Sequence, residues 1–422
     1  MARSVRRGGI PLVGWIRNFW YQSVRNQSLE FYQLLVTTAV LTAFGLLMVL
    51  SASVVNSLSE NLLWYGDILS QVIAFALGFA LLLVFSLTPT SLMDRFIMPT
   101  GWFVIGLQYL TAMVGLDING NKAWLKIGPI TFQPSELGKV LLVMMLAKVI
   151  AQRIEFPVFR GSNLLLQRPE LSAMSFAIVM FIGVTIQKDV GTVLVMAVMT
   201  LVLLWVAGID RYALLGWLAV FGVAGMAAMT LSDTRWPRIM AWLNPASDVL
   251  GIYTYQSQHG FWALAAGGLL GVGLGQSTLK WTWIPEVQND FIYAVVVEEF
   301  GFVGGAAVLV AFLFLGYVLI RIFHRTQDIM RRLIIAGVFA WIVVQALINI
   351  GVVIGALPVL GVPLPFISHG GTSMLFLLSA VGVVLAIERE NTHGQLAPRK
   401  KVPQATRRPA GRVSQFESRS RR

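Results

Sequence analysis

Ten apolar runs constrain this chain more than any other feature of its sequence. A helix that crosses a bilayer needs about 20 predominantly apolar residues, because no water is available there to satisfy the backbone. The runs fall near residues 33–55, 65–87, 97–116, 134–152, 172–187, 191–208, 212–231, 291–320, 333–355 and 370–388. The sequence therefore predicts an all-α integral membrane protein, with a membrane domain of about ten helices over residues 33–388.

The composition supports a membrane protein and excludes several kinds of site. Hydrophobic residues make up 56% of the 422 and charged residues only 12%, which is typical of a membrane bundle rather than a soluble domain. There is no cysteine, so disulfides and thiolate metal sites are excluded. The four histidines are scattered and predict no metal cluster.

The distribution of lysine and arginine predicts the topology. If all ten runs span, the alternate segments that include both ends of the chain hold 24 of the 32 basic residues. The opposite side holds six, and two lie within the fourth run. The positive-inside rule then places both termini in the cytoplasm. The net charge of +12 reflects this topology, and no nucleic-acid partner is predicted.

The two ends of the chain are basic extensions of the membrane domain. Residues 1–32 interleave arginines with tryptophans, which favours either a segment on the cytoplasmic interface or a disordered tail. Residues 389–422 contain few large apolar residues, which predicts a disordered cytoplasmic tail.

The opposite side of the membrane carries the unusual sequence. A large extracytoplasmic loop is predicted over 232–290, between the seventh and eighth runs. Its part from 261 to 275 is apolar but too short to span, so we expect an interfacial or re-entrant helix there. Arg235 and Arg238 lie in this loop, against the charge bias. Their guanidinium groups suit phosphate recognition, although solvated loop charges are the alternative.

Asp290 is the strongest candidate for a catalytic residue. It lies where the polar end of this loop becomes an apolar helix. One interpretation is a helix N-cap. The other is a general base, a partly desolvated carboxylate at the mouth of a membrane bundle. Further along the helix, Glu299 is predicted to be a buried partner of another helix, whereas Glu298 fits either a structural or a catalytic role.

Other polar residues interrupt the apolar pattern. Glu136 follows Pro134 at a predicted helix start, and Lys139 lies one turn deeper, where a cation needs a partner or a ligand. The two are three residues apart and can pair with each other. The segment 187–192 is predicted to be a tight turn. Ser368 and His369 lie in a Pro/Gly-rich loop and offer hydrogen bonds, but adjacency in sequence does not make a hydrolase triad.

Taken together, these motifs resemble the SEDS family of FtsW-, RodA- and SpoVE-like membrane proteins. The similarity extends over roughly 35–390, with the motifs in the same order. The matching stretches are Trp124 with 132–139, then 187–192, 238–248, 255–256, 271–277, 284–290, 298–301 and 365–373.

The resemblance implies a peptidoglycan glycosyltransferase with ten spans, which polymerises lipid II on the outer face of the bacterial cytoplasmic membrane. It also implies a class B penicillin-binding transpeptidase as partner, and it matches the essential carboxylate to Asp290. The candidate substrate-binding residues are Lys139, Glu136, Lys122, Trp124, Arg235, Arg238, Gln256, Glu286, Ser368 and His369. The basic residues among them would neutralise a leaving diphosphate, alone or with a divalent cation such as Mg²⁺ or Mn²⁺.

This chain departs from the family pattern at three motifs. Ala123 stands where relatives usually carry arginine, and neighbouring Lys122 is the candidate replacement. Lys188 and His369 replace the usual proline and tyrosine of their motifs.

The long basic ends favour the division-type members of the family, with other divisome proteins as partners and the septum as location. The alternatives are an elongation-type polymerase, a lipid II flippase, and a scaffold without enzymatic activity. A flippase would show similar intramembrane polar residues, but it needs access from both sides of the membrane.

Overall fold

The computed structural model describes residues 27–59, 66–118, 121–127, 130–155, 168–230, 235–248, 251, 253–278 and 287–396. The predictions for residues 1–26 and for the tail beyond 396 lie outside these ranges.

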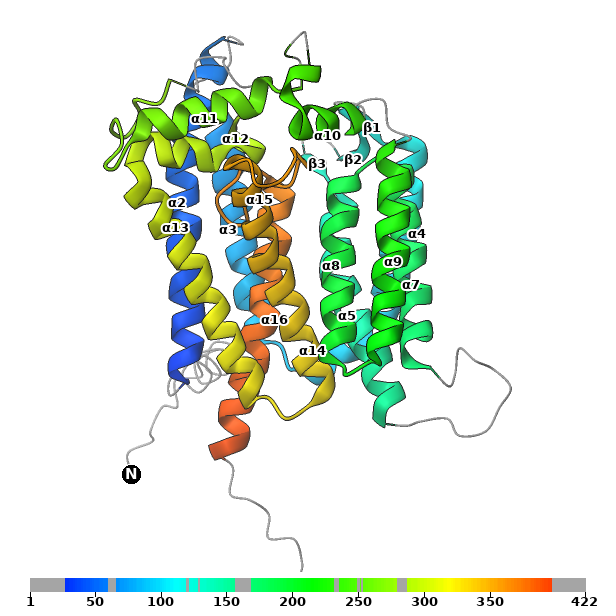
Figure 1. The fold of residues 1–422 in the computed structure, drawn as a ribbon. Helices are drawn as coiled ribbons and strands as arrows, with labels where there is room; N and C mark the ends of the chain where they lie inside the picture. The colour runs from blue at the N-terminus through cyan, green and yellow to red at the C-terminus, as the bar shows by residue number, and fades with distance from the viewer. Residues whose placement is uncertain are drawn as a thin grey trace, which may run out of the picture.

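Long helices packed side by side make up most of the molecule (Figure 1). In chain order they are α2 (Leu29–Ser59), α3 (Gly66–Leu87), α4 (Thr90–Val114), α5 (Pro134–Glu155), α7 (Pro169–Ile186), α8 (Val190–Val206), α9 (Arg211–Thr230), α13 (Ile292–Arg325), α14 (Ile329–Phe339), α15 (Gln345–Val353) and α16 (Gly371–Leu396). A π-helical turn, η2 (Ala340–Val344), joins α14 to α15 into one continuous rod.

Each of the ten predicted apolar runs is helical in this structure. Within the described ranges, eight helices are long and apolar enough to cross a membrane, counting α14, η2 and α15 as one. The all-α membrane fold is therefore confirmed. The number of crossings and the side on which the termini lie stay predictions.

The shorter elements gather at one end of the bundle, which we call the loop-bearing end (Figure 1). They are β1 (Leu116–Ile118), β2 (Asn121–Ile127), β3 (Ile130–Phe132), α10 (Arg235–Leu243), the 3-10 turn η1 (Pro245–Ser247), α11 (Tyr255–Gly267) and α12 (Val287–Asp290). The strands form an antiparallel sheet in the order β1-β2-β3. The start of α2 and the end of α16 lie at the opposite end (Figure 1).

The helix predicted as interfacial or re-entrant corresponds to α11, which lies across the loop-bearing end (Figure 1). It begins at Tyr255 and ends at Gly267, earlier than the predicted range of 261–275. Gly268 ends it, because its φ of 53° leaves the helical region. Leu269 and Leu270 beyond it are exposed, as expected of a segment facing the membrane interface.

The centre of the bundle is formed by α16 and by the α14–α15 rod, which are mostly buried within the protein. Over Arg211–Thr230, α9 has no buried residue and lies at the periphery. Helix α5 carries charged residues but packs inside, between α4, α7 and α14. The bundle therefore encloses ionisable side chains in its interior, where each requires a partner.

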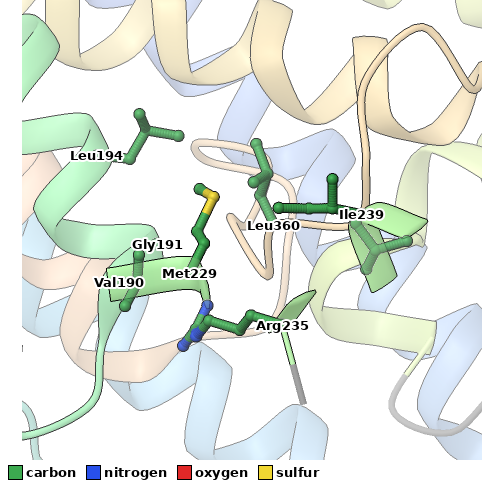
Figure 2. Close-up of a pocket in the computed structure, with 8 residues that line it drawn as sticks. Val190, Gly191, Leu194, Met229, Arg235, Ile239 and Leu360 are labelled. Atoms are coloured by element: carbon green, nitrogen blue, oxygen red, sulfur yellow. The ribbon is translucent and has the colours of Figure 1, made fainter. Parts of the chain in front are cut away.

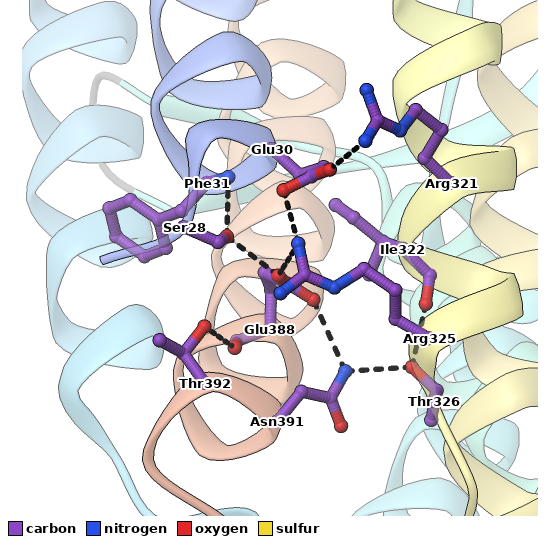
Figure 3. A network of polar contacts seen from close by, with 10 residues as sticks. All are labelled: Ser28, Glu30, Phe31, Arg321, Ile322, Arg325, Thr326, Glu388, Asn391 and Thr392. Atoms are coloured by element: carbon purple, nitrogen blue, oxygen red, sulfur yellow. Dashed lines mark hydrogen bonds and ion pairs between the residues drawn. The ribbon is translucent and has the colours of Figure 1, made fainter. Parts of the chain in front are cut away.

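A network of charged residues fastens the end opposite the loops (Figure 3). The carboxylate of Glu30 on α2, which is 3% exposed, accepts hydrogen bonds from Arg321, at 2.6 Å, and from Arg325 on α13. Arg325 also lies 3.4 Å from Glu388 on α16, and the Ser28 hydroxyl donates to Glu388 at 2.6 Å. Three helices that are far apart in sequence are thus joined at this end.

Candidate functional site

Asp290 lies at the loop-bearing end, as the last residue of the short helix α12. Its side chain is half-buried. The N-cap position of α13 falls one residue later, on Phe291, whose side chain makes no capping bond among the described residues. The structure therefore does not assign Asp290 the N-cap position that was the alternative to a chemical role.

The surroundings of Asp290 are set by α15 and by the loop of residues 354–370. The Asn349 side-chain amide donates to the Asp290 backbone carbonyl and to the Val362 carbonyl, both at 2.8 Å. The carboxylate faces Gly361 of this loop, since a Cβ built there would lie 3.7 Å from Asp290 Oδ2. A glycine at 361, with a φ of 69°, lets the loop backbone approach the carboxylate.

Hydrogen bonds fix the same loop along its length. The Gln345 amide donates to the Pro363 carbonyl at 2.8 Å, and the Leu364 N–H donates to the Ser368 hydroxyl at 2.8 Å. The His369 N–H donates to the Gln288 carbonyl on α12 at 2.9 Å. Ser368 and His369 therefore lie in the loop that adjoins Asp290, and the Ser368 hydroxyl helps to fold that loop.

One residue of the loop holds an unfavourable backbone conformation. Phe366 has a φ of 64° although it carries a bulky side chain, and it is buried. Such left-handed residues cost about 1–2 kcal/mol and persist where the surroundings hold them in place. Gly45 on α2 provides the space, since a Cβ there would lie 2.2 Å from the Phe366 carbonyl oxygen.

Glu136 and Lys139 form a buried ion pair near the start of α5. Lys139 Nζ lies 2.7 Å from Glu136 Oε1, and both side chains are almost fully enclosed. The ammonium also lies 4.9 Å from the ring centroid of Trp341, a cation–π distance. Glu136 Oε2 has no hydrogen-bond partner among the described residues. The predicted pairing is thus present.

The ion pair and Asp290 are contacted by different positions of the α14–α15 rod. Trp341, which contacts Lys139, precedes Asn349, which contacts Asp290, by eight residues of nearly continuous helix. At about 1.5 Å per residue, these two positions on the rod are about 12 Å apart.

Lys122 and Ala123, where relatives carry arginine, lie on opposite faces of β2. Successive side chains of a strand point to opposite faces. Ala123 is 1% exposed, whereas Lys122 is exposed. The replacement of that arginine by Lys122 stays a prediction. Trp124 is half-buried on the same strand and pairs with Leu116 of β1.

The segment 187–192 is a tight turn, as predicted. Lys188 has a φ of 63°, which a proline could not adopt. Asp189 caps α8 by accepting from the Thr192 N–H at 3.1 Å, and its other carboxylate oxygen accepts from Gln133 at 3.0 Å. The turn also meets the sheet, because the Lys122 N–H donates to the Gln187 carbonyl at 3.1 Å.

Arg235 on α10 joins this turn to the loop beside Asp290. Its guanidinium donates to the Lys188 carbonyl at 2.8 Å. Burial lowers the pKa of the Arg235 guanidinium from its usual value, while nearby Asp189 opposes the shift. An arginine stays protonated at neutral pH. The group is therefore a partly desolvated positive charge.

A small pocket lies between Arg235 and the loop (Figure 2). It is lined by Val190, Gly191, Leu194, Met229, Arg235, Ile239, Val359 and Leu360. Its free space of about 20 Å³ holds one water molecule rather than a sugar. Leu360 precedes Gly361, so consecutive residues of the loop line this pocket and face the Asp290 carboxylate.

The remaining candidate substrate-binding residues are placed by their elements and their burial. Arg238 on α10 and Gln256 on α11 are half-buried at the loop-bearing end, and Glu286 lies outside the described residues. Over the part of the chain that is described, no group of three or more His, Cys, Asp or Glu is arranged to hold a metal ion. The divalent cation stays a prediction.

Glu298 and Glu299 fix the loop that follows α11. Glu298 accepts from the Ser277 hydroxyl and, at 2.8 and 2.6 Å, from the N–H and hydroxyl of Thr278. Glu299 accepts from Ser51 on α2 at 2.6 Å. The prediction that Glu299 is a buried partner of another helix is confirmed, and the contacts of Glu298 are structural as well.

Sequence reasoning missed Gln345 and Asn349, the two buried amides that hold the loop beside Asp290. The signal was available, because both interrupt an apolar run and they are four residues apart.

The fold and the site define a multi-span membrane protein in which the Asp290 backbone is held by the buried Asn349 amide at one end of the bundle. The chain belongs to the FtsW/RodA/SpoVE family, because that family's model, described as cell cycle protein, matches residues 32–393. The resemblance to the SEDS family is thereby confirmed.

Individual relatives match over 70% or more of their own length. Stage V sporulation protein E of Bacillus subtilis is 33% identical over 364 residues, covering 84% of this chain and 96% of that protein. The probable peptidoglycan glycosyltransferase FtsW of Saccharophagus degradans is 32% identical over 398 residues, covering 91% and 98%. That of Mycobacterium tuberculosis is 32% identical over 377 residues, covering 88% and 70%.

Solved structures share the fold. A chain from a study of how a peptidoglycan synthase complex coordinates polymerisation and crosslinking superimposes with a TM-score of 0.69 at 25% identity, covering 85% of this chain and 98% of that chain. The rod shape determining protein RodA of Thermus thermophilus gives a TM-score of 0.61 at 25% identity, covering 85% and 96%.

Proposed function

We propose that this chain polymerises lipid II into glycan strands at its loop-bearing end, on the outer face of the bacterial cytoplasmic membrane. The chain is a peptidoglycan glycosyltransferase, the class that its FtsW relatives carry in their names. The observation that carries the proposal is the half-buried carboxylate of Asp290, which lies at that end beside Gly361, whose neighbour Leu360 lines a pocket with Arg235.

The reaction requires a base at the acceptor sugar. The acceptor hydroxyl gives its proton to Asp290 while its oxygen forms a bond to the anomeric carbon of the donor. The bond from that carbon to the diphosphate oxygen breaks, and its electron pair leaves with the lipid diphosphate. Direct displacement inverts the anomeric centre. A carboxylate positioned for such a proton transfer contributes about 10²- to 10⁴-fold in rate.

The leaving diphosphate requires positive charge, and the basic candidates differ in what they offer. Lys139 is already paired with Glu136 at 2.7 Å and contacts the rod at Trp341, eight residues before Asn349. Arg235 is partly desolvated and lines a pocket with Leu360, the neighbour of the Gly361 that faces Asp290. We therefore assign the first neutralising contact to Arg235, assisted by Arg238 and by a divalent cation where one is bound.

Vesicles that contain the purified protein and lipid II separate this function from a flippase. Polymer should form without net movement of lipid II between the leaflets, and an Asp290→Asn variant should form it about 10²- to 10⁴-fold more slowly. Movement of lipid II without polymer, abolished by the same substitution, would instead support the carrier.

The FtsW relatives favour a role in septal wall synthesis, with a class B penicillin-binding transpeptidase and other divisome proteins as partners. The matching chain from a peptidoglycan synthase complex supports a partner of this kind. The elongation role of RodA is the alternative. Adding the candidate division transpeptidase should raise the polymerisation rate, whereas stimulation by an elongation transpeptidase alone would favour the RodA-like role.

A further inference from the structure

A stripe of three buried side chains runs along the α14–α15 rod at four-residue spacing. Trp341 contacts Lys139, Gln345 binds the loop of residues 354–370, and Asn349 binds both that loop and Asp290. Residues four apart share a helix face. One face of this rod therefore contacts the ion pair in the interior, the loop and the proposed base.

Asn349 uses the full donor capacity of its amide. A side-chain NH₂ group carries two hydrogens, and here one goes to the Asp290 carbonyl and the other to the Val362 carbonyl, both at 2.8 Å. The residue is 1% exposed, so no bulk water replaces these bonds if they are lost. Its amide links two segments that meet at the carboxylate, because Gly361, next to Val362, faces Asp290 Oδ2.

The hydrogen bond from Asn349 to the Asp290 carbonyl helps to set where the Asp290 carboxylate lies. Asp290 ends a helix of only four residues and precedes Phe291, the first residue outside that helix. Its carbonyl is held by a side chain from another helix, and that anchor limits how far the Asp290 backbone can shift. A displacement of about 1 Å between reacting groups costs on the order of 10²-fold in rate.

We propose that Asn349 is a positioning residue, which sets the distance between the Asp290 carboxylate and the 354–370 loop by donating to the backbone of both. The inference rests on the proposed function, since it gives Asn349 a role only through Asp290. The loss of its amide should lower the turnover number and leave the lipid II concentration at half-maximal rate nearly unchanged.

Gln345 provides a matched control on the same helix face. It is 2% exposed, and its amide donates to the Pro363 carbonyl at 2.8 Å. Its substitution removes one buried bond to the same loop, one residue from Val362, and leaves the Asn349 bond to Asp290 in place. A purely structural role for the two amides predicts similar losses of activity from both substitutions.

The test compares Asn349→Ala, Asn349→Leu and Gln345→Ala in the full chain, purified in detergent, with lipid II as substrate. Both Asn349 variants should lose 10- to 100-fold in kcat with less than a threefold change in KM. Gln345→Ala should lose less than threefold in kcat at a comparable loss of thermal stability. Equal kcat values for Asn349→Ala and Gln345→Ala, or a loss confined to KM, would overturn the proposal.

Combining the substitutions separates this inference from the proposed function. If Asn349 acts through Asp290, Asn349→Ala should cause no further loss of turnover in an Asp290→Asn background. A full additional 10-fold loss there would show that Asn349 acts independently and would overturn the inference alone. Normal turnover by Asp290→Asn itself would contradict the proposed base, whatever the Asn349 variants show.

Discussion

The buried pair of Glu136 and Lys139 offers a sharp test of how this bundle tolerates charge in its interior. Removing one member of a buried pair costs about 3–5 kcal/mol, because the other charge stays enclosed without compensation. Lys139→Met also removes the contact with Trp341, whose ring centroid lies 4.9 Å from the ammonium, worth about 0.5–2 kcal/mol. We expect Lys139→Met to destabilise the protein by about 4–6 kcal/mol.

The double variant Glu136→Gln/Lys139→Met should recover most of that loss. Replacing both charges by neutral groups removes the uncompensated carboxylate, so its cost should be about 0–2 kcal/mol rather than the sum of the two single costs. The free energy of unfolding in mild detergent, measured by denaturant titration, gives all three values.

Lys148→Met on the same helix is the matched control. Lys148 donates to the Asp94 backbone carbonyl, so its loss removes a charge-assisted hydrogen bond of about 1.5–3 kcal/mol, and the nearby Asp94 carboxyl keeps the stronger influence of Arg331. A cost for Lys139→Met below that of Lys148→Met, or additive costs in the double variant, would refute the reasoning that the pair is buried and mutually dependent.

Two further predictions concern the packing around the site and at the far end. Gly45→Ala should lower the free energy of unfolding by about 1–3 kcal/mol and slow polymerisation, because its methyl group would lie 2.2 Å from the Phe366 carbonyl oxygen. Gly106→Ala is the control, because nothing described lies within 4 Å of the added methyl group. Equal melting temperatures for the two variants would contradict the prediction. Glu30→Gln, at the end opposite the loops, should lower the free energy of unfolding by only about 1–2 kcal/mol, because its partner Arg321 is 43% exposed. Polymerisation per folded molecule should not change. A specific loss of turnover would show that this end of the bundle acts on the site.

The membrane fold could be predicted because the apolar runs that cause it are visible in the sequence itself. Runs of about 20 apolar residues have few alternatives to helix in a bilayer, and all ten became helices. The small sheet was missed because β1 and β3 have only three residues each. In β2, residues Asn121, Lys122 and Lys126 weaken the apolar alternation that indicates a strand.

The site was only partly predictable from sequence. Asp290 stood out because a carboxylate where a loop enters a bundle is costly and therefore informative. Asn349 did not, because the paired amides Gln345 and Asn349 indicate a polar stripe but not its partners, and only the fold brings the Asp290 and Val362 carbonyls to Asn349. The sequence did not show that Lys122 and Ala123 lie on opposite faces of a strand, because β2 itself was not predicted.

The rate of glycan chain growth by an Asp290→Asn variant tests the central claim most directly. Asparagine keeps the shape of the side chain and removes its ability to accept a proton. With purified, folded protein and lipid II, the account predicts a loss of about 10²- to 10⁴-fold in turnover, with an unfolding midpoint close to that of the unmodified chain. Chain growth within threefold of the normal rate would contradict the assignment of Asp290 as the base.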